Sequence, residues 1–397
     1  MAQSSGSPRT YDLVLLGATG FTGGLTADYL AEHAPDGLRW AIAGRSKEKL
    51  ERVRERLGAG AETVDLLVAD SSDEASLRDL ASQTKVVATT VGPYLEYGAP
   101  LVAACAQEGT DYADLTGEPE FVDRTYVDHQ ATAEASGARL VHACGFDSIP
   151  HDLGAYFTIR QLADAVGGEI TEPVTMRGVV RSNGTFSGGT FHSALTAFGR
   201  ARQMRDAMQA RKRVEPRPEG RRSKAVAGKP GRDKLLGYWL LPLPTIDPFI
   251  VARSGAALPS YGPDFRYSHF AGTKTLRYAA GGAVGASALA VAAQVPPVRN
   301  TLKKRVPQGS GPSEGRRNAS WFSVEFVAES GDTTVRTKVS GGDPGYTETA
   351  KMLAESTLCL ALDDNPPTAG QVTTAEAMGD ALLARLQAAG LTFARVR

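Results

Sequence analysis

Three glycines near the start of the chain have the spacing of a loop that could hold a dinucleotide. Gly17, Gly20 and Gly23 directly follow the apolar run 13–16, and a helix-like pattern follows them. Glycine permits a sharp turn and a close approach of backbone to ligand, and the new helix would point free N–H groups at a pyrophosphate. The spacing is G-x-x-G-x-x-G rather than the G-x-G-x-x-G of the dinucleotide-binding motif. The prediction therefore depends on the position of the turn between a strand and a helix. The alternative is a glycine turn that packs the helix and binds no ligand. The residues predicted to contact the cofactor here are Gly17, Thr19, Gly20, Phe21 and Gly23.

The end of the second predicted strand, 38–43, indicates which dinucleotide binds. Sites that prefer NAD usually carry an acid at this point for the ribose 2′-hydroxyl, whereas an Arg accommodates a 2′-phosphate. This chain has Arg45 and Ser46 there, and no carboxylate until Glu48. A guanidinium can hold a phosphate through two hydrogen bonds and stack on adenine. We therefore predict NADP(H); the alternative is a solvated Arg45 at the start of a charged helix over 47–57.

Two more strand ends carry predicted cofactor contacts. The third predicted strand, 64–69, closes with Asp70, where an adenine edge is commonly held, and the fourth, 86–91, runs into the sequence TTVGPY at 89–94. In an open parallel sheet the ligand binds at the carboxyl ends of the strands. The cofactor site is therefore predicted to include Asp70, Thr90, Val91 and Gly92.

Several common reactions lack their motifs in this chain. The N-terminal part has no Tyr-x-x-x-Lys pair, and the chain has neither a G-x-S-x-G nucleophile motif nor a zinc-type spacing of His and Cys. We therefore predict no metal ion. With a nicotinamide cofactor and no metal, the remaining reaction is hydride transfer.

Three residues are candidates for the proton donor or for a group that holds the reacting oxygen. Tyr94 follows the fourth strand, and Asp147 and His151 follow the sixth, predicted over 139–143, where the nicotinamide is expected. Each of the three also has a packing or loop-capping role as its alternative. The carboxylates around the fifth strand, predicted over 111–115, are predicted to have a structural role; they are Asp111, Asp114 and Glu118.

The elements that must position these residues alternate between strand and helix, which indicates βαβ units and a parallel sheet. We predict the α/β class, with a Rossmann-type, doubly wound parallel sheet in an NADP-binding domain over residues 1–150. Strand-like segments at 174–180, 323–327 and 335–339 predict a second α/β domain with a mixed sheet over 151–345. Residues 346–397 are expected to form two helices, 347–362 and 374–389, that return to the first domain.

The second domain contains one basic and two apolar segments. Residues 211–234 are rich in Arg, Lys, Pro and Gly, and we predict a mobile surface loop. The apolar segments are 235–250 and 278–298, and the second has no charged residue between Arg277 and Arg299. Its length could cross a bilayer, but its content of Ala and Gly favours a buried or interfacial helix over a span.

Composition limits the partners and the compartment. The 397 residues include 44 basic and 44 acidic side chains, so no net charge favours nucleic acid. The three cysteines, Cys105, Cys144 and Cys359, are far apart, and the N-terminus is polar without an apolar signal core. We expect a cytoplasmic protein, with contact at the inner face of the plasma membrane as a further option.

A set of motifs resembles one protein family in order along nearly the whole chain. They are GATGFTG at 17–23, AGRS at 43–46, TTVGPY at 89–94, DYADLTGE at 111–118, HACGFDSIP at 142–150, GDPGYTETAKMLAE at 342–355 and AEAMGDALLARL at 375–386. These motifs resemble the saccharopine dehydrogenase-like oxidoreductases, and within them the actinobacterial trans-acting enoyl reductase branch. Residues 205–320 are the least diagnostic part.

The resemblance implies an NADP(H)-binding Rossmann domain and a second domain of saccharopine-reductase type. In this branch it also implies reduction of an enoyl thioester in (glyco)lipid biosynthesis, on a modular polyketide synthase that lacks its own enoyl reductase. The expected partner is such a synthase or an acyl carrier protein. Peripheral membrane contact and a homodimer are further expectations. Two other functions stay open: an NADP-dependent enzyme of the same fold acting on an imine or a carbonyl, and a non-catalytic NADP-binding protein associated with a membrane or a synthase.

Overall fold

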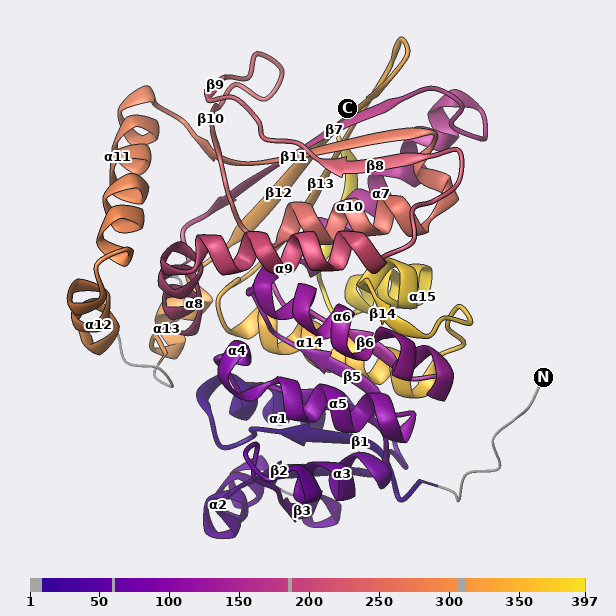
Figure 1. Cartoon of the computed structure of the whole chain (residues 1–397), viewed down its shortest axis with the longest axis vertical. Coiled ribbons are helices and arrows are strands. Elements are labelled where there is room, and N and C mark those ends of the chain that lie inside the picture. Colours follow the sequence, from indigo (N-terminus) through magenta and orange to yellow (C-terminus); the bar gives the residue numbers. More distant parts are fainter. Residues whose placement is uncertain (1–8, 59–60, 185–187, 306–310, 397) are drawn as a thin grey trace.

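The structure, a computed structural model, describes residues 9–58, 61–184, 188–305 and 311–396. Two sheets lie one above the other in Figure 1, and the first third of the chain, to the end of β6 at Val141, surrounds the lower sheet. The first sheet is parallel and has the strand order β14-β6-β5-β4-β1-β2-β3 in the described residues. Its strands are β1 (Tyr11–Leu16), β2 (Trp40–Gly44), β3 (Asp65–Val68), β4 (Thr84–Thr89), β5 (Asp111–Asp114), β6 (Arg139–Val141) and β14 (Gly370–Val372).

Helices cover both faces of this sheet, and they bury β1 and β2 completely. One face carries α1 with α14, and the other carries α3, α5 and α6. The doubly wound α/β fold predicted from the sequence is confirmed. The helices of this part are α1 (Phe21–His33), α2 (Lys47–Leu57), α3 (Glu74–Ser82), α4 (Tyr94–Tyr97), α5 (Ala99–Glu108), α6 (Pro119–Ser136), α14 (Thr347–Leu362) and α15 (Thr374–Ala388).

The second sheet is mixed, as predicted. Its described strands have the order β15-β13-β12-β7-β11-β10-β9, and β8 also pairs with β11. The pairs β11–β7 and β11–β8 are parallel, and the others are antiparallel. The strands are β7 (Val174–Ser182), β8 (Arg222–Ala225), β9 (Gly231–Arg232), β10 (Trp239–Pro242), β11 (Asp264–Thr273), β12 (Phe322–Ser330), β13 (Thr333–Gly341) and β15 (Thr392–Val396).

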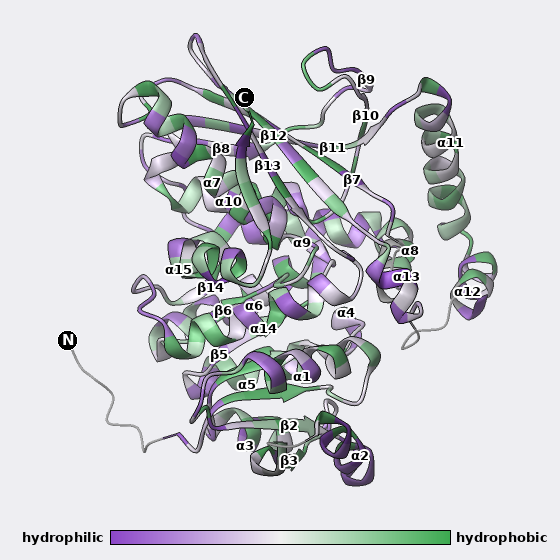
Figure 2. Cartoon of the chain, turned by 180° about the vertical axis from the view of Figure 1, so that it is seen from behind, coloured by the Kyte–Doolittle hydropathy of each residue, from purple (hydrophilic) through white to green (hydrophobic). Residues whose placement is uncertain are grey.

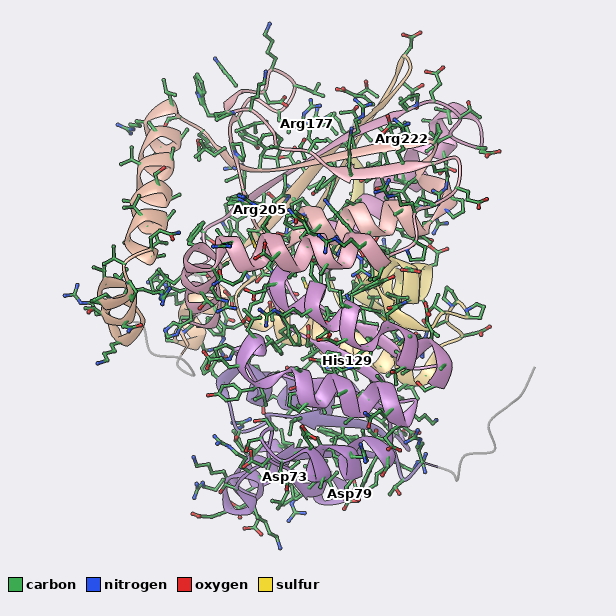
Figure 3. All side chains as sticks on the ribbon, in the orientation of Figure 1. Asp73, Asp79, His129, Arg177, Arg205 and Arg222 are labelled. Atoms are coloured by element: carbon green, nitrogen blue, oxygen red, sulfur yellow. The ribbon has the colours of Figure 1, made fainter. Side chains whose placement is uncertain are left out.

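One hydrophobic core joins the two sheets. It runs from Leu30 of α1 through Leu353 of α14 and Leu153 of α7 to Phe326 of the second sheet, and all four side chains are buried. Side chains fill the space between the layers (Figure 3). The helices associated with the second sheet are α7 (Ile149–Val166), α8 (Gly188–Gly199), α9 (Ala201–Val214), α10 (Asp247–Ala257), α11 (Leu276–Ala293), α12 (Pro296–Arg305) and α13 (Glu314–Asn318).

The basic segment 211–234 is more ordered than the predicted mobile loop. Helix α9 continues to Val214, and β8 and β9 both lie within the segment, so the prediction was wrong for these parts. Arg211 is buried in ion pairs with Asp123 and Glu215, and Arg222 lies on β8 (Figure 3). Low apolar content misled the prediction, because here ion pairs and strand pairing, rather than apolar burial, hold the segment.

The last fifty residues contribute to both sheets. α14 packs on α1 and on β4, while β14 extends the first sheet beside β6, and β15 extends the second beside β13. Neither strand was expected from the sequence. Both are short, and β14 pairs with β6 along one edge only.

Candidate active site

The glycine turn between β1 and α1 has the shape of a site for a phosphate group. Gly17 has φ +96°, and a Cβ on Gly23 would lie 2.1 Å from the carbonyl oxygen of Gly17. The hydroxyl of Thr90, after β4, donates to the same carbonyl at 3.2 Å. Gly20 caps α1 with no side-chain hydrogen bond, and the first turn has no acid. The free N–H groups and the dipole of α1 therefore remain available to an anion, which fits the pyrophosphate of NADP(H).

The fourth strand places its predicted residues beside this turn. A Cβ on Gly17 would touch the side chains of Thr90 and Val91, so the two loops pack directly together. Gly92 and Thr19 are exposed. Phe21 differs from its prediction, because its ring packs against Tyr346 and lies beneath the guanidinium of Arg317. The ring therefore joins α1 to the second half of the chain, and only the backbone of Phe21 lies at the helix N-terminus.

The ends of β2 and β3 bring the predicted adenosine contacts together. Arg45 is exposed, and its charge contributes to the lowered pKa of Asp70, although hydrogen bonds from Ser72 are the main cause. Ser46 caps α2 by accepting from the N–H of Lys49 at 3.4 Å. No acid lies on the chain between the end of β2 and Glu48. The residues present therefore fit a 2′-phosphate better than a free 2′-hydroxyl.

Replacing Arg45 with Asp is expected to weaken NADPH binding by at least about tenfold and NADH binding by less than about threefold, because only NADPH carries the 2′-phosphate. Titration of each cofactor by protein fluorescence measures both affinities. Arg52→Asp, on the exposed side of α2, is the control and should change neither. An equal loss for both cofactors would contradict the 2′-phosphate contact.

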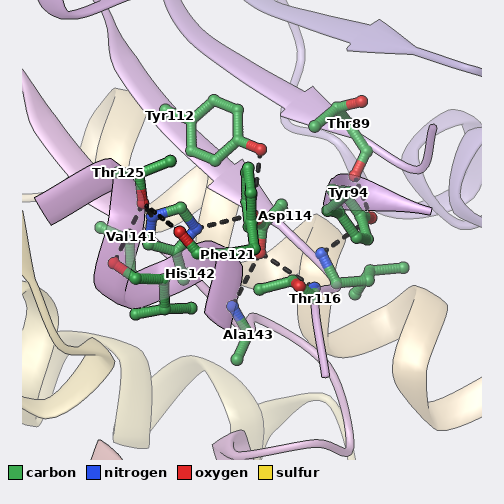
Figure 4. Close-up of polar contacts among 12 residues, drawn as sticks. Thr89, Tyr94, Tyr112, Asp114, Thr116, Phe121, Thr125, Val141, His142 and Ala143 are labelled. Carbon is green, nitrogen blue, oxygen red and sulfur yellow. Dashed lines mark hydrogen bonds and ion pairs between the residues drawn. The ribbon is translucent and has the colours of Figure 1, made fainter. Parts of the chain in front are cut away.

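Tyr94 does not face a substrate in this structure. Its side chain is buried, its hydroxyl donates to the carbonyl of Thr89 at 3.1 Å, and it accepts from the N–H of Leu115 at 3.1 Å (Figure 4). Burial, together with the charge of Asp114, holds the pKa of Tyr94 well above its usual value. These contacts argue against Tyr94 as a proton donor and assign it to holding the β4 and β5 loops together.

Asp114 is the centre of the same buried network. Its carboxylate accepts from the N–H groups of Thr116 and Ala143 at 3.0 and 2.8 Å and from the hydroxyl of Tyr112 at 2.9 Å, and it pairs with His142 at 2.7 Å (Figure 4). Asp111 pairs with Arg139, and Glu118 accepts from the N–H groups of Tyr94 and Leu95. Asp114 and Glu118 order loops at the carboxyl end of the sheet, whereas Asp111 holds Arg139 at the amino ends of β5 and β6. These contacts agree with the structural role predicted for the three acids.

Removing the Tyr94 hydroxyl is expected to cost stability rather than catalysis. Tyr94→Phe leaves the N–H of Leu115 without its partner, which should lower the free energy of unfolding by about 1–3 kcal/mol. Urea unfolding measures this loss, and the kcat of NADPH oxidation should stay within about threefold. A loss of kcat beyond about 100-fold with unchanged stability would restore Tyr94 as the proton donor.

The loop after β6 carries the two other candidates. It is bracketed by two non-glycine residues with positive φ, Ala143 at +59° and Ser148 at +144°. Such strain persists only where the surroundings fix it, and it concentrates at functional sites. Here the N–H of Ala143 is held by Asp114, and the Ser148 hydroxyl donates to Asp247 at 3.4 Å. The strained loop places the Asp147 carboxylate against Gly117. A Cβ added to Gly117 would lie 3.1 Å from that carboxylate.

His151 lies in a buried cluster that the sequence did not reveal. Its Nε2 is 3.5 Å from Asp247, at the start of α10, and Nε2 of His269, on β11, is 3.7 Å from the other oxygen of the same carboxylate. The two imidazole rings meet edge to face at 4.7 Å, and His269 also bonds the Tyr267 hydroxyl. Asp247 and His269 are about 100 residues or more from His151, with no shared motif, so only the fold brings them together.

Burial sets the protonation of this cluster. It lowers the pKa of His151 to about 3, and burial with the neighbouring His151 lowers that of His269 to about 3, so both rings are neutral at pH 7. Burial, with the charge of Asp247, raises the pKa of half-buried Asp147 to about 7. Burial also raises the pKa of Asp247. Asp147 is therefore an acid whose proton is available near neutrality, and neither His can serve as a cationic acid.

Comparisons with known proteins agree with this architecture. The profile of the saccharopine dehydrogenase NADP binding domain matches residues 13–141. A Mycobacterium tuberculosis protein provisionally named a trans-acting enoyl reductase is 40% identical, over 98% of this chain and 99% of its own. A Mycobacterium bovis protein named trans-acting enoyl reductase is 37% identical, over 99% of both chains.

A solved structure shows the same fold at lower identity. Saccharopine dehydrogenase (L-Glu forming) from Saccharomyces cerevisiae superposes with a TM-score of 0.55 at 13% identity, over 97% of this chain and 99% of its own. This likeness shows the fold, and the full-length relatives together with the NADP-binding profile show the family. The chain belongs to the saccharopine dehydrogenase-like oxidoreductases, an NADP-binding family.

Proposed function

We propose that this protein is an NADPH-dependent enoyl reductase that acts in trans on an acyl or polyketide thioester carried by a separate synthase or acyl carrier protein. The substrate class comes from the names of relatives that are 37–40% identical over nearly their full length. The observation that carries the chemistry is Asp147, an acid with its pKa raised to about 7 at the carboxyl end of the sheet that bears the glycine turn.

When bound, NADPH supplies the hydride that adds to the β-carbon of the enoyl thioester. The free N–H groups at the start of α1 and the Arg45 side chain would hold its phosphates. Thr90 and Val91 keep the β1 and β4 loops closed on each other beside that position.

Asp147 would give its proton to the α-carbon, and the negative charge that builds up after hydride addition to the β-carbon would lie mainly on the thioester oxygen. A donor with a pKa near the working pH is effective as a general acid and can recover its proton from solvent, which its half-buried position allows. Burial and the nearby charge of Asp247 raise the pKa of Asp147 and so keep it protonated up to about neutral pH. Backbone N–H groups of the loops that hold Gly117 and Ser148, which lie on either side of the Asp147 carboxylate, would donate to the thioester oxygen.

Oxidation of NADPH by a panel of thioesters tests this proposal. Full-length protein is mixed with NADPH and with 2-enoyl, 3-oxo and saturated acyl pantetheine thioesters, and with a cyclic imine. Turnover is expected with the 2-enoyl thioesters alone, and mass spectrometry should show a gain of two hydrogens. Turnover only with the imine or the 3-oxo substrate would move the protein to another reductase class. Tight NADPH binding without turnover of any substrate would support a non-catalytic role.

A further inference from the structure

Helix α11 is apolar, and most of its surface is exposed to solvent. Of its eighteen residues only Ala279 and Ala293 are buried, while Val284 and Val291 are about 70% exposed. In Figures 1 and 2 the helix lies beside the body of the protein, and Figure 2 colours it as hydrophobic for much of its length. A helix that is apolar all round is normally surrounded by apolar material. The described residues do not supply that cover, so a partner must.

The inner side of α11 is attached to the protein at a few points. A Cβ added to Gly282 would lie 3.3 Å from the Leu241 side chain on β10, so the two elements are in contact there. The Gln294 side chain donates to the carbonyl of Phe198 at the end of α8. The rest of the helix surface includes a shallow apolar hollow lined by Ala283, Val284, Ser287, Ala288, Val291 and Ala292. These small side chains give a smooth surface without projecting anchors, which suits acyl chains better than the pockets of a protein interface.

Basic residues flank α11 on both sides. Residues 265–313 contain no Asp or Glu, although the whole chain has equal numbers of acids and bases. Lys274 and Arg277 lie before the apolar stretch, and Lys304 and Arg305 end α12; all four are exposed. Tyr278 is 62% exposed beside the Arg277 guanidinium, in the position that aromatic residues take at a membrane interface. This charge pattern fits a surface of anionic lipid headgroups.

The connections of α11 exclude a transmembrane span. By length and composition it is the one helix among the described residues that could cross a membrane, and 11% of its apolar window is buried. However, β11 precedes it, β12 follows α13, and both strands pair with β7 in one sheet. A span would place these strands on opposite sides of the bilayer. The return segment carries Glu314, Arg316 and Arg317, so it cannot cross back.

We propose that α11 and α12 dock this protein on an anionic lipid bilayer. α11 lies along the membrane surface with its open apolar side among the acyl chains, and the basic residues at its two ends contact lipid phosphates. The helix is about 27 Å long, so it lies flat over several lipids and leaves the two sheets in water. The sequence-based preference for a buried or interfacial helix is thereby narrowed to an interfacial one.

Vesicle sedimentation of the full-length protein tests this docking. Vesicles of phosphatidylcholine alone are compared with vesicles that contain about a third phosphatidylglycerol. We expect binding to the anionic vesicles that weakens with salt. The double variants Val284→Glu/Val291→Glu and Lys304→Glu/Arg305→Glu should each lower the partition coefficient at least about tenfold. The matched control is Val68→Glu, also an exposed valine (61%) but on β3, which should stay within about twofold.

Several outcomes would overturn the docking. They are no sedimentation of the wild-type chain with anionic vesicles, equal binding of the valine variants, or binding to an acidic acyl carrier protein or a second copy of the chain without vesicle binding. NADPH affinity and the melting temperature of each variant verify that it is folded. Reduction of a short, water-soluble enoyl thioester should not change in these variants, so failure of docking and failure of the proposed reaction are distinguishable.

Discussion

Gly23→Ala is expected to lower the affinity for NADPH at least about 100-fold and to reduce the melting temperature by several degrees. An added Cβ would lie 2.1 Å from the carbonyl of Gly17 and 2.7 Å from the Thr90 hydroxyl, and real Cβ contacts are not that short. The β1–α1 turn would have to open, and the hydrogen bond from Thr90 to Gly17 would be lost. The N–H groups of α1 would then no longer converge on one phosphate. Isothermal titration with NADPH and a thermal melt measure both effects.

Gly24→Ala is the matched control one residue later in the same helix. Its Cβ would meet the end of the flexible Arg56 side chain at 3.1 Å, with no backbone atom nearer than 3.7 Å. Alanine is a better helix former than glycine by about 1 kcal/mol, so this variant should melt at the same temperature or higher and bind NADPH within about twofold of wild type. Unchanged NADPH binding by Gly23→Ala would mean that the turn does not hold the pyrophosphate.

The first sheet and its cofactor loop could be predicted from the sequence because their signals are local. A strand, a glycine turn and a helix are adjacent in the chain, and six of the seven described strands of that sheet were predicted near their observed bounds. β14 was missed because it has three residues and depends on β6 for its place. Tyr94 was predicted to face the substrate from its position alone, and its two backbone hydrogen bonds could not be foreseen.

The polar cluster of the candidate site could be predicted only in part. Asp147 and His151 were predicted as site residues because they follow a strand end. Asp247 and His269 were missed because they come from the second domain, far along the chain. The sequence held a weak sign in the Asp-Pro pair that begins α10, which reads equally well as an ordinary helix start. The strained backbone at Ala143 and Ser148 has no signature in residue type, since neither is glycine.

Asp147→Asn is expected to lower kcat by about 100–1000-fold and to leave NADPH affinity within about twofold, because an amide cannot donate the proton but fills the same space. In the wild type, kcat/KM should be constant below about pH 7 and fall about tenfold per unit above it, since only the protonated acid can donate. The variant should lack this alkaline limb. Asp164→Asn, at the exposed end of α7, is the control for loss of a negative charge and should behave as wild type.

Asp247→Asn provides a second, independent measurement on the same acid. The charge of Asp247 helps to raise the pKa of Asp147, so its removal should lower that pKa and move the alkaline limb to lower pH, while kcat at acidic pH falls much less than in Asp147→Asn. A structural role alone would change kcat or stability without shifting the limb. A wild-type profile with no limb near pH 7, or full activity of Asp147→Asn, would exclude Asp147 as the acid and direct the search to the loop donors around Ser148.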